Sequence, residues 1–209
     1  MILSRIERFA VALAFVLLPS ALPRAATPSP EAPVEKSTLT GQLLIASPDI
    51  GDPRFAHTVI FLVRHNREGA FGIVINRPVE ERSLKSLLEA IGQDTSGVEG
   101  SVRVFAGGPV ETEIGFVLHS ADYKRPETVV VDGRLALTSS PDVLRDMGHG
   151  RGPKKSLVAF GYAGWGPGQL EGELARHDWF TAPADPALIF DEDRDRVWDR
   201  AKARRTLDL

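Results

Sequence analysis

The sequence predicts an α+β fold in one domain, and three observations predict it. About eight short apolar runs follow one another with hairpin spacing, as in an antiparallel sheet. Four or five other segments, by a rough count, have apolar residues at helical spacing. Strands and helices do not alternate regularly, which disfavours a Rossmann-type sheet, and 209 residues with 43% apolar side chains supply one sizeable core.

Residues 1–26 have the pattern of a cleaved secretory signal peptide. Arg5 and Arg8 precede a ten-residue apolar run, Phe9 to Leu18, which is too short to cross a bilayer because crossing takes roughly 20 residues. Residues 27–38 carry three prolines and almost nothing to bury, so we expect an extended linker there. We predict a periplasmic protein without a transmembrane span once the leader is removed. An uncleaved anchor and a cytoplasmic location are the alternatives.

The folded domain is expected at residues 39–209, and its first half is predicted to consist mostly of strands. A polar segment, 65–69, is expected to close a hairpin between two strands that are apolar on both faces. Ser83 is placed to cap a helix, because apolar residues follow it as one stripe at helical period. The strands predicted in this half are 43–46, 58–63, 70–75, 102–105 and 116–118.

The second half of the domain is predicted to contain a tight hairpin and most of the helices. Asp132 and Gly133 tolerate the positive φ of a tight turn between two strands. Ser140, Pro141 and Asp142 have the pattern of a helix start, with a hydroxyl cap, an early proline and a carboxylate near the positive end. Strands are predicted at 128–131, 135–137 and 157–160, and helices from 142, at 168–176, from 185 and at 194–205.

The composition excludes several classes of site. The chain has no cysteine, which excludes disulfides, iron–sulfur clusters, thiolate zinc sites and a cysteine nucleophile. A net charge of −3 argues against nucleic acid as a partner. The five histidines are scattered without metal-ligand spacing, and no nucleophile or phosphate-loop motif is present. We therefore predict no metal and no cofactor, and the question of an enzymatic activity stays open with a leaning towards none.

Two glycine-rich segments are the leading candidates for a ligand site. Gly107 and Gly108 directly follow a predicted strand, and 161–168 runs from a strand to a helix start. Glycines there let the backbone approach a partner closely, and free N–H groups at the helix start hold anions. A tight strand-to-helix connection in which the aromatic residues only pack is the alternative. The candidate residues for a small anionic ligand or a protein partner are Gly107, Gly108, Gly164, Trp165, Gly168 and Gln169.

Three further side chains are candidates because of their chemistry and position. His65 and His119 each follow a predicted strand, and imidazole titrates near neutral pH, as acid–base catalysis requires. Arg77 ends another strand and is placed at a rim. The alternatives are structural, namely a histidine that ties a loop to backbone carbonyls and an arginine that is ion-paired to a carboxylate.

A series of sequence blocks covers nearly the whole of residues 39–190. They are Leu43 to Pro48, Asp52 to Phe55, Thr58 to Leu62, His65, Gly69 to Pro78, Gly107 to Val110, Gly115 to His119 and Gly161 to Glu171. In this order they resemble the YqgE/AlgH family. The resemblance implies a bifurcated, partly barrel-like and mostly antiparallel sheet surrounded by helices. It implies no established reaction, although one branch is named for a proposed transcriptional role in alginate production.

We predict a non-enzymatic regulatory domain that binds a ligand or a partner, and two alternatives stay open. A transcriptional regulator, as the name of one family branch suggests, requires DNA binding through basic patches such as the terminal helix. A hydrolase with His65 or His119 as its base requires one imidazole within about 3 Å of a serine hydroxyl or a carboxylate in a pocket.

Overall fold

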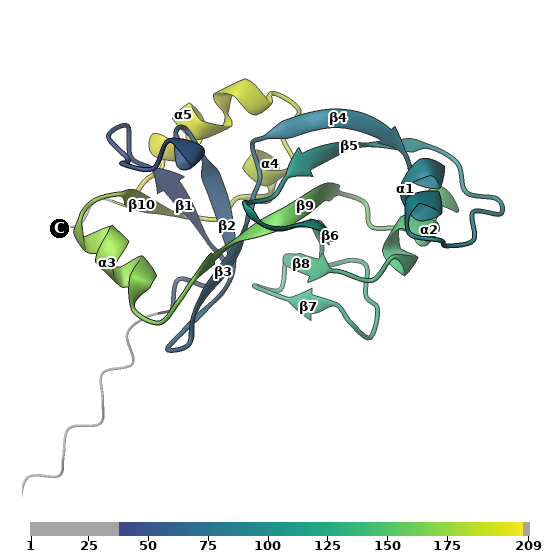
Figure 1. Ribbon diagram of the computed structural model, residues 1–209, viewed down its shortest axis with the longest axis horizontal. Coiled ribbons are helices and arrows are strands. Elements are labelled where there is room, and N and C mark those ends of the chain that lie inside the picture. Colours follow the sequence, from purple (N-terminus) through teal and green to yellow (C-terminus); the bar gives the residue numbers. More distant parts are fainter. Residues whose placement is uncertain (1–37, 207–209) are drawn as a thin grey trace, which may run out of the picture. The chain divides into compact units, whose positions relative to one another are not determined.

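A computed structural model of the protein describes residues 38–206 (Figure 1). The predicted leader, and all but the last residue of the predicted linker, lie outside the described residues. The described part contains ten strands, five α-helices and two short 3₁₀ helices. None of its helices combines the length and the apolarity that crossing a bilayer requires.

One long strand, β9 (Ser156–Trp165), is shared by the two branches of a bifurcated sheet (Figure 1). Its second half joins the first branch, in the order β10 (Trp179–Pro183), β1 (Gln42–Ala46), β2 (Val59–Asn66) and β3 (Gly69–Val74). Its first half joins the second branch, in the order β4 (Pro78–Ser83), β5 (Ser101–Ala106), β9, β6 (Val110–Ser120), β8 (Leu135–Thr138) and β7 (Val129–Val130). Paired strands of the described chain are antiparallel, except that β5 and β9 are parallel. The predicted fold class is confirmed.

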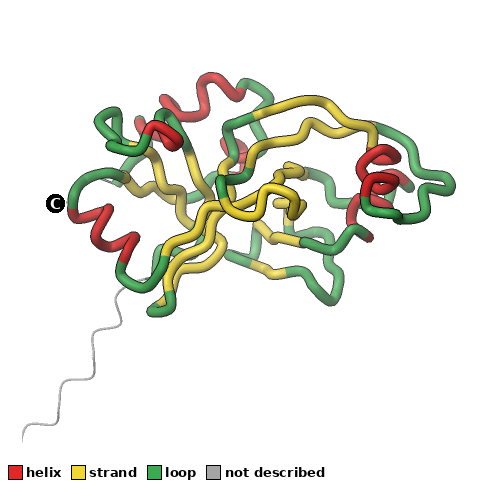
Figure 2. Tube along the Cα trace, viewed as in Figure 1, coloured by secondary structure: helices red, strands yellow, loops and turns green. Residues whose placement is uncertain are grey.

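Short helices surround the sheet, and most of them lie towards its two ends (Figure 2). They are α1 (Leu84–Ala90), α2 (Asp142–Gly148), α3 (Gln169–Ala175), α4 (Pro186–Ile189) and α5 (Val197–Lys202), with the 3₁₀ helices η1 (Pro53–Phe55) and η2 (Arg194–Arg196). α1 and α2 pack together beyond the second branch, whereas α3 and α5 contact strands of the first. As predicted, Ser83 caps α1, because its Oγ accepts the Ser86 N–H at 3.1 Å.

Three glycines let the two branches separate at β9. Gly161 has φ +74°, a left-handed conformation within the strand, and so redirects β9 from one branch to the other. A Cβ at Gly107 would lie 2.3 Å from the Gly161 carbonyl oxygen, and one at Gly108 would lie 2.0 Å from the Tyr162 carbonyl carbon. The Gly107 N–H donates to the Phe160 carbonyl at 2.7 Å. The backbone of β9 therefore occupies the space beside Gly107 and Gly108 that a side chain would fill.

Three segments differ from the expectations drawn from the sequence. β4 is not predicted, because its side chains are mostly exposed and charged and give no apolar face. β10 is not predicted either, since its short mixed pattern ends in Pro183 and lacks a clear period of two. The expectation that 161–168 is a glycine-rich connection is wrong for 161–165, which extend β9. Glycine at these positions serves the bend and the close packing of the strand.

Candidate functional site

His119 lies on β6 in the core of the second branch and has no exposed surface. Its Nδ1–H donates to the Ser120 carbonyl at 2.9 Å, since a carbonyl only accepts. Nε2 is then an acceptor and receives a hydrogen bond from the Thr138 hydroxyl, 2.9 Å away. Burial lowers the pKa of this imidazole, so His119 is neutral in the folded protein at neutral pH.

The free energy of unfolding is expected to fall as the pH drops below 6.5, the ordinary pKa of histidine. In that range the unfolded chain protonates His119, whereas the folded chain, with its lowered pKa, does not. One such group changes the free energy by up to about 1.4 kcal/mol per pH unit. Urea titrations at about pH 7.5 and about pH 5.5 should show a smaller loss for His119→Asn than for the wild type. An equal loss in the two proteins would contradict the buried neutral state.

His65 binds the backbone of Leu39, close to the first described residue. Its Nδ1 accepts the Leu39 N–H at 3.1 Å, which places the ring proton on Nε2, 3.4 Å from Glu171 Oε1. The hydrolase alternative requires an imidazole within about 3 Å of a serine hydroxyl or a carboxylate in a pocket. His119 is enclosed in the core, and His65 lies between a backbone N–H and the Glu171 carboxylate, with which it forms no hydrogen bond. Neither of these two imidazoles therefore meets this requirement.

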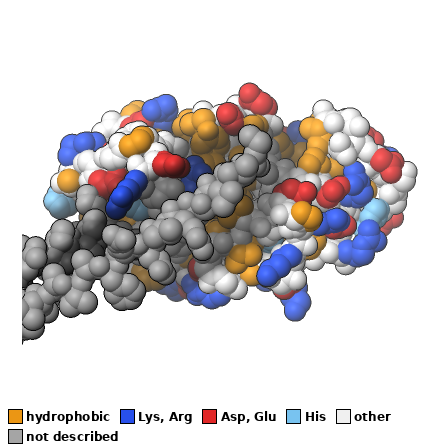
Figure 3. Space-filling model, turned by 90° about the horizontal axis from the view of Figure 1, so that it is seen from below, with side chains coloured by type: hydrophobic (Ala, Val, Ile, Leu, Met, Phe, Trp, Pro, Cys, Tyr) orange, Lys and Arg blue, Asp and Glu red, His pale blue; other side chains and the backbone are white. Residues whose placement is uncertain are grey.

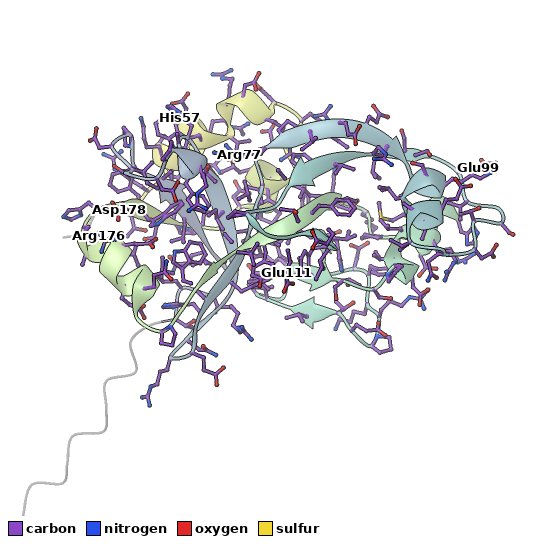
Figure 4. The ribbon with its side chains drawn as sticks, viewed as in Figure 1. His57, Arg77, Glu99, Glu111, Arg176 and Asp178 are labelled. Carbon is purple, nitrogen blue, oxygen red and sulfur yellow. The ribbon has the colours of Figure 1, made fainter. Side chains whose placement is uncertain are left out.

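A cleft of about 490 Å³ opens beside α3 and η1 at the edge of the first branch. Three segments that lie far apart in the sequence line it, namely 50–55, 109–110 and 164–179. Its volume lies in the range typical of small-molecule sites. Arg176 and Asp178, labelled in Figure 4, lie at the cleft where α3 leads into β10.

Aromatic rings and one carboxylate form the ordered wall of this cleft, which we call the aromatic cleft. Phe55 and Trp179 meet edge to face with 5.4 Å between ring centroids, and Trp165 and Trp179 do so at 6.0 Å. Both indole Nε1–H groups donate to Glu173 Oε2, each at 2.8 Å. The Gln169 amide donates to Glu173 Oε1 at 3.0 Å. Three donors thus fix the carboxylate, and each buried indole donates its only N–H group to it.

Two ion pairs neutralise the arginines of the aromatic cleft. Arg54 Nη2 donates to Asp52 at 2.7 Å, and the hydrogen bonds from Arg54 hold the pKa of Asp52 below its ordinary value. Arg176 Nη2 donates to Asp178 at 3.0 Å. Within residues 38–206, Glu173 takes part in no ion pair. Two guanidinium groups and three carboxylates line the cleft, so its net formal charge is −1.

The turn that ends α3 brings Arg176 and Asp178 together. His177 has φ +60°, and its N–H donates to the Leu174 carbonyl at 2.9 Å. The Asp178 N–H reaches back to the Glu173 carbonyl at 3.0 Å. This pair of bonds is the Schellman pattern, in which the left-handed residue is usually glycine.

Replacing His177 with glycine is expected to raise the free energy of unfolding by up to about 1 kcal/mol. A non-glycine residue in the left-handed conformation costs roughly 1–2 kcal/mol, and the greater freedom of glycine in the unfolded chain offsets part of the relief. His177→Ala is the control, because it removes the ring and keeps the strain. Urea unfolding measures both variants, and a destabilised His177→Gly would contradict this account of the turn.

The structure brings three of the candidate residues together. Gly164, Trp165 and Gln169 line the aromatic cleft, and Gly168 lies next to them as the residue that precedes α3. The other candidates lie at the branch junction (Gly107, Gly108), at the hydrogen-bonded positions described above (His65, His119) and at a separate cavity (Arg77).

The candidates predicted from the sequence leave out most residues of the aromatic cleft, among them Phe55, Glu173 and Trp179, which form its wall. Glu173 lies four residues after Gln169, so helical spacing would place the two side chains together. Trp179 has no such local signal, because it reaches the cleft through the pairing of β10 with β1. The described residues contain no group of three or more potential metal ligands, and the absence of a metal or cofactor stays a prediction.

Comparison with known proteins identifies the family. The family model described as AlgH-like matches residues 43–209. A UPF0301 protein from Jannaschia sp. is 51% identical over 165 residues, which are 78% of this chain and 86% of that protein. A UPF0301 protein from Methylococcus capsulatus is 44% identical over 86% of this chain and 98% of its own length.

Solved structures agree with this assignment. The solution structure of the AlgH protein from Pseudomonas aeruginosa is similar, with a TM-score of 0.69 and 40% identity over 86% of this chain and 92% of that one. A crystal structure of a protein from Corynebacterium diphtheriae shares the fold, with a TM-score of 0.63 and 21% identity over 80% of this chain and 87% of that one. The family predicted from the motifs is thus confirmed, and the chain belongs to the AlgH-like family.

Proposed function

We propose that this protein is a non-enzymatic regulatory domain and that its ligand occupies the aromatic cleft. One observation carries the proposal. Three segments that are distant in the sequence line the same cleft, and two indole N–H groups hold the Glu173 carboxylate in its wall. Apolar rings with a few fixed polar groups are typical of small-molecule sites, and a wall ordered before binding lowers the entropic cost of association.

The charge of the cleft favours a ligand that joins a cation to a flat apolar group. Arg54 and Arg176 are paired with aspartates, whereas Glu173 has no cationic partner among the described residues. Its carboxylate accepts three hydrogen bonds and has room for a further donor. Aromatic faces also attract cations. An amine or guanidinium ligand therefore fits this lining better than the small anion that the sequence predicts.

Two probes of similar size and opposite charge test the proposal. 2-Phenylethylamine and 3-phenylpropionate share a phenyl ring on a short chain and differ in the sign of their charge. We expect the amine to bind with a dissociation constant of about 0.1–1 mM, and the acid to bind at least about tenfold more weakly. Isothermal titration measures both affinities. The indole N–H signals of Trp165 and Trp179 in NMR spectra should shift with the amine.

Two variants of α3 control this experiment. Glu173→Gln keeps the size of the side chain and one acceptor oxygen but removes the charge, so the preference for the amine should disappear. Glu171→Gln is the matched control, because Glu171 lies on the same helix, faces His65 and does not line the cleft. Stronger binding of the acid would favour the anionic ligand predicted from the sequence. Failure of both probes to bind would contradict the proposal.

The transcriptional alternative has little support in the described basic side chains. Arg200 pairs with Asp191, and Arg204 pairs with Asp185, so two of the four basic side chains in residues 200–205 are neutralised. Figure 3 shows acidic and basic side chains mixed over the face that it displays. A DNA-binding surface is usually a continuous basic patch.

We also propose export to the periplasm, which rests on the leader pattern of residues 1–26. Cell fractionation with N-terminal sequencing of the mature protein tests it. A periplasmic protein that begins after the leader is expected, and a cytoplasmic protein that retains Met1 would contradict the proposal.

A further inference from the structure

A second cavity, of about 440 Å³, lies beside α5 and shares no lining residue with the aromatic cleft. Arg77, Arg194 and Trp198 contribute to its wall, and Arg194 and Trp198 are buried. His57 contributes an exposed part of the lining, and Figure 4 labels both His57 and Arg77. Two arginines thus line one cavity, and Arg194 also lines another cavity, to which Phe105 contributes.

Arg194 is a buried cation that forms no ion pair within residues 38–206, and only 8% of it is exposed. Its Nη1 donates to the carbonyls of Ile75 at 3.3 Å and Ile189 at 2.7 Å, and its guanidinium lies 4.8 Å from the ring centroid of Phe105. These bonds use two of its five N–H groups, and the buried Nε has no acceptor in the described chain. Burial lowers the pKa of Arg194, as expected for a cation that lacks a counter-ion.

Carboxylates outside this cavity are engaged with other arginines. Glu192 Oε2 lies 3.5 Å from Arg103 Nη1, and Asp191 pairs with Arg200. Neither carboxylate is therefore available as the close counter-ion of Arg194.

Arg77 also forms no ion pair within the described chain, so the structural alternative considered for it does not apply. Its Nη2 donates to the Ala56 carbonyl at 3.1 Å and to the Thr58 hydroxyl at 2.7 Å. Its Nε and Nη1 have no acceptor among residues 38–206. The adjacent Asn76 fixes the same wall, since its amide donates to the His57 carbonyl at 2.8 Å.

Two carboxylates in the lining oppose the binding of an anion. Asp195 and Asp199 are both exposed, so water and salt screen their charges, whereas the charge of Arg194 is buried and screened less. We propose that this cavity binds a small oxyanion, a carboxylate or phosphate group, through the unused N–H groups of Arg77, and that the buried charge of Arg194 adds to the attraction. A guanidinium binds either a carboxylate or a phosphate through paired N–H···O bonds.

Titration with inorganic phosphate, and separately with acetate, at constant ionic strength tests this proposal and tells the two groups apart. We expect the Nε–H signals of Arg77 and Arg194 in NMR spectra to shift with at least one anion, with a dissociation constant of about 1–10 mM. Arg77→Gln should weaken binding by about tenfold or more. Arg77→Lys keeps the charge but loses the planar pair of donors, so its affinity should be intermediate.

Arg196→Gln is the matched control, because Arg196 is exposed, lies two residues after Arg194 and does not line the cavity. It should leave the affinity unchanged. If Arg77→Gln does not fold, the Arg194 signal in the wild type and the affinity of Arg77→Lys decide the question. No shift with either anion, or equal weakening by Arg196→Gln, would overturn the proposal.

Discussion

Gly108→Ala is expected to lower the free energy of unfolding by about 4 kcal/mol or more, or to prevent folding. A Cβ at this position would lie 2.0 Å from the carbonyl carbon of Tyr162 and 2.2 Å from its oxygen, and the backbone has φ +153°, which side chains rarely adopt. β9 cannot easily yield, because β3, β5 and β6 all pair with it. Urea unfolding followed by circular dichroism measures the loss.

Gly166→Ala is the matched control for this prediction. Gly166 directly follows β9, and a Cβ there would meet its nearest heavy atom, Gln169 Oε1, at 4.0 Å. Its effect should therefore stay within about 0.5 kcal/mol. If Gly108→Ala lost less than about 1 kcal/mol, the close backbone packing at the branch junction would be refuted.

Glu173→Ala is expected to lower the free energy of unfolding by roughly 2–4 kcal/mol. The substitution leaves the indole N–H groups of Trp165 and Trp179 without their shared acceptor, and the two residues are only 7% and 3% exposed. A buried donor left without a partner costs about 1–3 kcal/mol. Urea unfolding gives the loss, and hydrogen exchange at the two indoles reports where it arises.

Two comparisons separate this effect from a general loss of charge. Glu173→Gln retains an acceptor oxygen, so it should lose less stability than Glu173→Ala. Glu89 lies on α1, and its side chain is 56% exposed. Glu89→Ala should therefore change the free energy of unfolding by about 0.5 kcal/mol or less. Equal losses for Glu173→Ala and Glu89→Ala would mean that the indoles do not depend on Glu173.

Most of the fold follows from local pattern, because buried strands and amphipathic helices leave a period in the sequence. The runs that become β1, β2 and β3 are predicted in this way, as are the cap of α1 and the inner face of α5. β4 is not predicted from the sequence, since an exposed charged strand has no apolar period. The bifurcation depends on the left-handed φ of Gly161. A glycine in a sequence permits this conformation but does not predict it.

Only part of the aromatic cleft is local in sequence. Gly164, Trp165 and Gln169 lie close together around the start of α3, so a glycine-rich pattern finds them. Phe55 comes from another segment, and Trp179 lies on β10, beyond α3. Both reach the cleft through tertiary structure, and the pairing of β10 with β1 positions Trp179. The charge of the cleft is likewise hidden in the sequence, because it depends on which arginines are already paired.

The most direct test of the aromatic cleft as the ligand site is a crystal structure of the protein with 2-phenylethylamine. We predict that the phenyl ring lies against Phe55 and Trp179, with the ammonium group within about 3 Å of the Glu173 carboxylate. A crystal soaked at saturating concentration in which the cleft holds only water, or in which the amine lies elsewhere on the molecule, would contradict this account.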